Sequence, residues 1–120
     1  APPGRGVAAA IHYRFGDLWH WFPGDVLYDG YQGWASSLAK ERVNRELTCL
    51  VFSDAPSTAR RSIEVLDGCS EVKMMMDVGD VLSFYMMAAA PVSIVAESSF
   101  SYWAALLAAG KSLVVVPELD

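Results

Sequence analysis

The sequence predicts an α/β fold, with an open, mainly parallel sheet of about five strands and helices on both faces. Short apolar runs of strand length alternate along the chain with segments of helix length. The runs are apolar nearly throughout, as is typical of strands buried on both faces of a parallel sheet. Strict alternation of strand and helix indicates right-handed βαβ units rather than hairpins.

The first half of the chain contains two expected strands and one helix. Residues 7–13 form an apolar run, and residues 16–33 follow as a long loop rich in aromatic side chains. A helix is expected from about residue 31 to residue 45, and the second strand covers residues 47–52. Three apolar side chains lie at helical spacing and predict the buried stripe of that helix: Trp34, Leu38 and Val43.

The second half repeats the alternation. Ser57 is an N-cap candidate for a helix that runs to about residue 66, where Asp67 and Gly68 break it. A strand is expected over residues 72–76, and a helix from residue 81 ends before Pro91. Strand 92–96, an apolar helix over 100–109 and strand 112–116 complete the chain. The helix after residue 80 carries apolar side chains at helical spacing: Val81, Phe84, Tyr85 and Ala88. We expect the first, second and fourth strands at the sheet centre.

Length and composition predict one domain with one core. The chain has 120 residues, of which 53% are hydrophobic, as in a packed globular domain. Its net charge of -5 disfavours nucleic-acid binding, which needs clustered Lys and Arg. No apolar run approaches the roughly 20 residues that cross a bilayer. We expect residues 1–6 to be a linker or truncated end, and residues 7–120 to be a domain from a longer protein.

Cys49 and Cys69 are the two cysteines of the chain. Cys49 falls inside an expected strand, and Cys69 follows Gly68 in an expected loop. We therefore predict that both are free thiols, packed as small apolar groups. The spacing of His12 and His20 in the sequence does not match that of a metal-binding motif, so we expect no metal site.

Polar residues follow four of the expected strands. In an open parallel sheet, ligands bind beyond the carboxyl ends of the strands, so these residues should meet at one edge. The candidate residues for binding a nucleotide sugar are His12, Arg14, Asp17, Ser53, Asp54, Asp77, Ser98, Ser99, Phe100 and Ser101.

Three of these candidates have alternative explanations. The serine-rich turn at residues 98–101 presents backbone N–H groups and a helix N-terminus suited to phosphate, but taken alone its serines are better explained as ordinary N-caps. Arg14 offers a fork for phosphate oxygens, or a salt bridge to Asp17. His12 is either a donor to the ligand or a hydrogen-bonded histidine near the sheet edge.

Three motifs carry a family resemblance. The segment IHYRFGD at residues 11–17 resembles the HxRRGD motif of the α-1,2-fucosyltransferases and their relatives. VFSD at residues 51–54 resembles their FSDD strand end. SSFSYWAA at residues 98–105 resembles their NSTFSWWAA segment, and a strand ending in Pro117 follows. Order and spacing match over nearly the whole chain.

The resemblance implies the Rossmann-like, donor-binding half of a GT-B-like enzyme. Its activity would be inverting, metal-independent transfer of fucose from GDP-fucose to a sugar hydroxyl of a glycan acceptor. Arg14 would hold the β-phosphate and His12 would help to place the diphosphate, so both count as catalytic candidates. Asp54 would lie near the guanosine, the three serines would donate to phosphates, and Asp17 and His20 are candidate bases.

The resemblance also implies partners and a compartment. The partner would be the N-terminal domain of the same enzyme, and the compartment would be the Golgi in a eukaryote or the cytoplasm in a bacterium. Two positions depart from the family motifs. Phe15 replaces the second Arg and Glu97 replaces Asn. These departures favour an alternative function, a non-catalytic nucleotide-binding or interaction domain.

Overall fold

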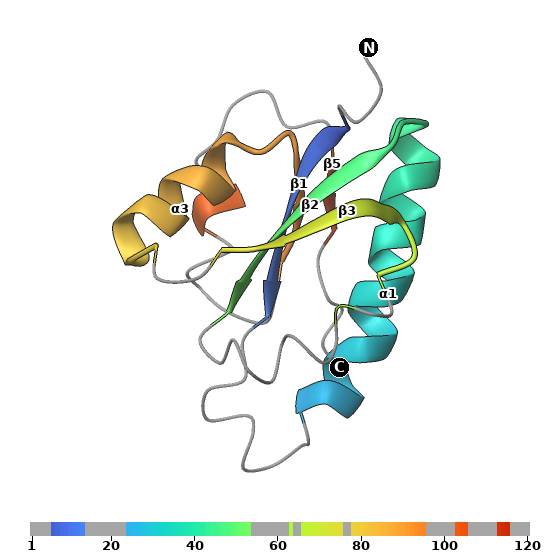
Figure 1. Ribbon diagram of the computed structural model, residues 1–120, viewed down its shortest axis with the longest axis horizontal. Helices are drawn as coiled ribbons and strands as arrows, with labels where there is room; N and C mark the ends of the chain where they lie inside the picture. Colours follow the sequence, from blue (N-terminus) through green and yellow to red (C-terminus); the bar gives the residue numbers. More distant parts are fainter. Residues whose placement is uncertain are drawn as a thin grey trace.

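The computed structural model describes residues 6–13, 24–53, 63, 66–75, 78–95, 103–105 and 113–115. Within these residues, five strands and two helices follow in the order β1, α1, β2, β3, α3, β4 and β5 (Figure 1). Their bounds are Val7–Tyr13, Gly24–Val43, Leu47–Ser53, Cys69–Met74, Asp80–Ala89, Val92–Ile94 and Leu113–Val115.

The strands form one parallel sheet in the order β3-β2-β1-β4-β5. Each neighbouring pair is parallel, and β1 pairs with β2 along its whole length, from Val7 opposite Leu47 to Tyr13 opposite Ser53. This order is that of a doubly wound, Rossmann-like α/β fold. The predicted fold class is confirmed, and so is the central position of the first, second and fourth strands.

The two faces of the sheet are covered by different helices. In Figure 1 the sheet lies between α1 on one side and α3 on the other. Alternate residues of β1 point to opposite faces, so Ile11 and Tyr13 belong to the core under α1, whereas Ala10 belongs to the core under α3. Ala104, in the short helical segment 103–105, also packs in the α3 core. Crossovers on both faces are what the predicted βαβ alternation requires.

Helix α1 begins earlier than the sequence predicted. It starts at Gly24, inside the segment expected to be a loop, and ends at Val43. The predicted apolar stripe is wrong at Trp34, which is 58% exposed, whereas Val43 does pack against the core. Three small side chains at helical spacing are fully buried instead, Ala35, Ser36 and Ala39, and so is the larger Gln32. A stripe of small residues lets the helix backbone come close to the strands. This packing overrides the weak helix propensity of the glycines within α1.

Helix α3 buries less of its apolar surface than its sequence suggests. Met87 is buried against the sheet, but Val81 and Tyr85 of the predicted stripe are 72% and 67% exposed. Leu82 is exposed beside them. The expected end before Pro91 is confirmed, since the helix stops at Ala89. Helix α3 is therefore largely apolar, and within the part of the chain that the structure describes its exposed face carries Val81, Leu82 and Tyr85.

Cys49 and Cys69 form a disulfide, so the prediction of two free thiols is wrong. The prediction failed because β3 begins at Cys69, three residues before the expected start of the strand. The two Cα atoms are 5.8 Å apart across the neighbouring strands β2 and β3. Ser70 adds a second link, because its hydroxyl donates to the carbonyl oxygen of Leu47 at 3.0 Å. The bond therefore ties the edge strand to the buried one.

The helix expected over residues 57–66 and most of the helix expected over 100–109 lie outside the described residues. Ile63 and Leu66 are described, and both contribute to the core under α1. The expected turn at Asp67 and Gly68 is present. Among the described residues, no helix is both long and apolar enough to cross a lipid bilayer.

Candidate functional site

The carboxyl ends of β1 and β4 lie side by side at the centre of the sheet. The register between these strands ends with Ile11 opposite Ile94. The chain leaves β1 toward α1, which packs on one face, and leaves β4 toward Ala104, which packs on the other. Connections that diverge to opposite faces define the switch point of a doubly wound sheet, where such folds open a crevice for a ligand. The candidate site is therefore the edge beyond Ile11 and Ile94.

His12 lies at this edge, one residue past the last β1–β4 pair. It is 7% exposed and faces the α3 side of the sheet, two positions along β1 from Ala10. Ser93 lies on the same face of β4, opposite Ala10 in register, and is 4% exposed. The Ser93 hydroxyl has no hydrogen-bond partner among the described residues. An imidazole and a hydroxyl thus stand on the same side of the central strands, within an otherwise apolar layer.

Ser53 ends β2, directly opposite Tyr13 at the end of β1. The strand order therefore brings together the carboxyl ends of β2, β1 and β4, from which three of the four candidate segments continue. Strand β3 is different, because it is an edge strand separated from β1 by β2. Strand spacing is about 4.8 Å, which sets the end of β3 roughly 10 Å from the end of β1.

The other candidate residues continue from these strand ends but lie outside the described residues. They are Arg14, Asp17, Asp54, Asp77, Ser98, Ser99, Phe100 and Ser101. Their strands fix the edge of the sheet from which each segment leaves. Arg14 follows β1 directly, and the serine-rich turn follows β4, its immediate neighbour.

Two residues of α1 that were not predicted from the sequence, Tyr31 and Gln32, also contact this edge. The Tyr31 hydroxyl lies 2.9 Å from the carbonyl oxygen of Val95 and 3.0 Å from that of Val115. The Gln32 amide donates through Nε2 to the carbonyl oxygen of His12 at 2.9 Å. The small residues that follow at helical spacing mark the buried face of this helix. Recognising these small residues as the buried face of α1 would have placed Gln32 against the sheet.

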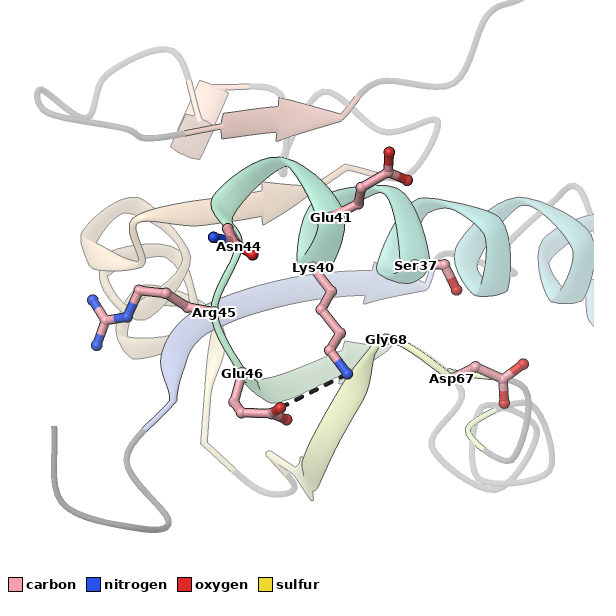
Figure 2. A pocket seen from close by; sticks show the side chains of 8 residues that line it. All are labelled: Ser37, Lys40, Glu41, Asn44, Arg45, Glu46, Asp67 and Gly68. Carbon is pink, nitrogen blue, oxygen red and sulfur yellow. Dashed lines mark ion pairs between the residues drawn. The ribbon is translucent and has the colours of Figure 1, made fainter.

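A hollow of about 570 Å³ lies at the opposite edge of the sheet, beside the C-terminal end of α1 (Figure 2). Glu46 precedes β2 and Gly68 precedes β3, so the hollow is at the amino ends of the strands. Its walls carry charges of both signs, and Lys40 pairs with Glu46 at 3.8 Å while both side chains stay about half exposed. Figure 2 shows Arg45 pointing away from that pair. An open hollow with three carboxylates on its walls, and with Lys40 already paired to Glu46, is a poor nucleotide site, so the carboxyl edge remains the candidate.

Within the described ranges, no cluster of three or more His, Cys, Asp or Glu side chains is placed to hold a metal ion. Comparisons with protein-family models, with curated proteins and with solved structures found no match to this chain. A functional proposal for this chain therefore rests on its sequence motifs and on the strands from which they continue.

Proposed function

We propose that the chain binds a nucleoside diphosphate sugar at the switch point between β1 and β4, as the donor-binding part of a fucosyltransferase-like glycosyltransferase. One observation supports this most directly. The two motif segments suited to a diphosphate, with Arg14 in one and the serine-rich turn in the other, continue from neighbouring central strands with diverging connections. Such a crevice is where doubly wound folds bind phosphate-bearing ligands.

In the proposed reaction, a hydroxyl of the acceptor glycan attacks the anomeric carbon of fucose. The bond from that carbon to the β-phosphate oxygen breaks, and GDP leaves with the bonding electrons. The proton of the attacking hydroxyl passes to a base, for which Asp17 and His20 are the candidates in this chain. Arg14 stabilises the negative charge that develops on the phosphate, which needs no metal. His12, nearly buried at the end of β1, donates to the diphosphate. Donors fixed on strand ends lose little entropy when the ligand binds.

The assignment is tested by replacing Arg14 with alanine and titrating GDP calorimetrically. We expect the dissociation constant to rise by about 10- to 100-fold, since hydrogen bonds to charged groups contribute about 1.5–3 kcal/mol. Arg45→Ala is the matched control, because it also removes one positive charge, here from an exposed side chain at the opposite edge of the sheet. Unchanged binding in Arg14→Ala, or equal losses in both variants, would count against the proposal.

The second candidate function is non-catalytic nucleotide binding. Phe15 removes a positive charge and Glu97 adds a negative one beside the proposed phosphate site. Both changes weaken the stabilisation of a leaving diphosphate more than the recognition of the nucleoside. Transfer of labelled fucose to a galactoside by a protein containing this chain would exclude this second function. GDP binding without any transfer would favour it.

A further inference from the structure

Two side chains of α1 hold the ends of the strands that flank the candidate crevice. Gln32 donates its amide hydrogen to the His12 carbonyl oxygen, at 2.9 Å. Tyr31 brings its hydroxyl to the carbonyl oxygens of Val95 and Val115, at 2.9 and 3.0 Å. Adjacent residues of one helix thus reach β1, β4 and β5 at their carboxyl ends.

The position of the bonded carbonyls within the strands is informative. The β1–β4 ladder ends with Ile11 opposite Ile94, so His12 and Val95 are the first residues beyond it on each strand. Beyond this level β1 and β4 share no further pair in their register, although His12 still pairs with Phe52 of β2 and the Val95 N–H donates to the Val115 carbonyl oxygen at 2.9 Å. Tyr31 and Gln32 add side-chain hydrogen bonds from α1 at this same level.

Gln32 is unusual in its burial. It is fully buried, and its Oε1 atom has no hydrogen-bond partner among the described residues. A methionine would fill a similar volume without burying an unpaired oxygen, so stability alone is a weak reason for glutamine here. Its amide N–H, by contrast, makes a hydrogen bond to the backbone near the end of β1.

We propose that Tyr31 and Gln32 are positioning residues for the diphosphate: they set the spacing between the segments that leave β1 and β4. This inference rests on the proposed function. Arg14 lies two residues beyond the carbonyl that Gln32 holds, and the serine-rich turn begins three residues beyond the one that Tyr31 holds. A diphosphate that must contact both segments binds tightly only when their spacing is fixed beforehand, because otherwise binding must order them.

The experiment compares GDP with guanosine on the whole chain. We expect Tyr31→Phe and Gln32→Met each to raise the dissociation constant for GDP by about fivefold, which corresponds to losing one ordinary hydrogen bond. Guanosine lacks the diphosphate, so its binding should change less than twofold. A general loss of folded protein would weaken both probes equally, and the ratio of the two constants is therefore the readout.

Ser36→Ala is the matched control. Ser36 lies one turn further along α1, is fully buried, and accepts a hydrogen bond from the Gly68 N–H at 3.1 Å, at the amino edge of the sheet. Its loss should lower the melting temperature without changing the ratio of GDP to guanosine affinity. Tyr31→Phe removes one oxygen atom only, so it decides the test if Gln32→Met does not fold.

The possible outcomes separate the inference from the proposed function. If the wild-type chain binds GDP and the variants change both probes equally, or neither, Tyr31 and Gln32 are merely structural and the inference is overturned while the function stands. If the wild-type chain binds no GDP, the proposed function fails and takes the inference with it. A selective loss of GDP binding in the α1 variants, absent from Ser36→Ala, establishes the positioning role.

Discussion

Replacing Gly68 with alanine should lower the free energy of unfolding by about 3 kcal/mol or more, at the upper end of what overpacking causes. An added Cβ would fall well inside the van der Waals radius of the Ser36 carbonyl group and close to the Ser37 nitrogen. Both are backbone atoms of α1, so the helix must move away from the start of β3. Urea denaturation followed by circular dichroism measures the change.

Two further variants make this experiment decisive. Asp67→Ala changes the exposed neighbour in the same turn and should stay within about 0.5 kcal/mol of wild type. Adding Ser36→Gly to Gly68→Ala should restore nothing, because the clash is with the carbonyl and not with the hydroxyl. A Gly68→Ala protein as stable as the Asp67 variant would show that α1 and β3 are not in such close contact.

Reducing the Cys49–Cys69 disulfide should lower the free energy of unfolding by about 3 kcal/mol, the value expected for a loop of this length. The cysteines are 20 residues apart in sequence, and the bond joins the edge strand β3 to the buried strand β2. Reduction of the bond increases the conformational entropy of the unfolded chain, and this entropy must be lost on folding. Reduction also leaves hydrogen bonds as the remaining link between β3 and β2.

Thermal unfolding with and without dithiothreitol measures this effect, and hydrogen exchange of the β3 amides locates it. The double variant Cys49→Ala/Cys69→Ala should resemble the reduced protein and become insensitive to reductant. Alkylation of both thiols without prior reduction, or equal melting temperatures in the two buffers, would contradict the cross-link.

The sheet was predictable because parallel strands buried on both faces leave a continuous apolar run. The bounds of β1 agree with the prediction, and β2 is longer by a single residue, Ser53. The edge strand was predicted less well, since β3 starts at Cys69 and not at residue 72. One of its sides is open to solvent, so Glu71 and Lys73 are exposed and interrupt the apolar pattern.

The helices were harder to predict because large apolar residues are not always the buried ones. Trp34 suggested one face of α1, whereas the helix packs through Ala35, Ser36 and Ala39. Close approach favours small side chains, and hydrophobicity scales do not register that preference. The cysteine pairing was missed for a related reason: it depends on which strands are neighbours, and strand order is not visible in the sequence.

The candidate site was predictable in outline only. Placing functional residues after strand ends needs only a parallel sheet, and His12 and Ser53 do lie at the carboxyl edge. The central position of the β1–β4 switch point required the strand order. Tyr31 and Gln32 bond to backbone carbonyls of strands distant in sequence; the small residues of α1 could have placed Gln32 against the sheet, but not identified its partner.

The bond between β2 and β3 has a practical consequence for making this protein. Glutathione and thioredoxin keep thiols reduced in most cytosols, so a chain synthesised there would reach its native sheet without this covalent link. Export to a periplasm, or secretion from a eukaryotic host, supplies the oxidant that two neighbouring thiols need. Yield and shelf life should therefore depend on the choice of host more than on the choice of buffer.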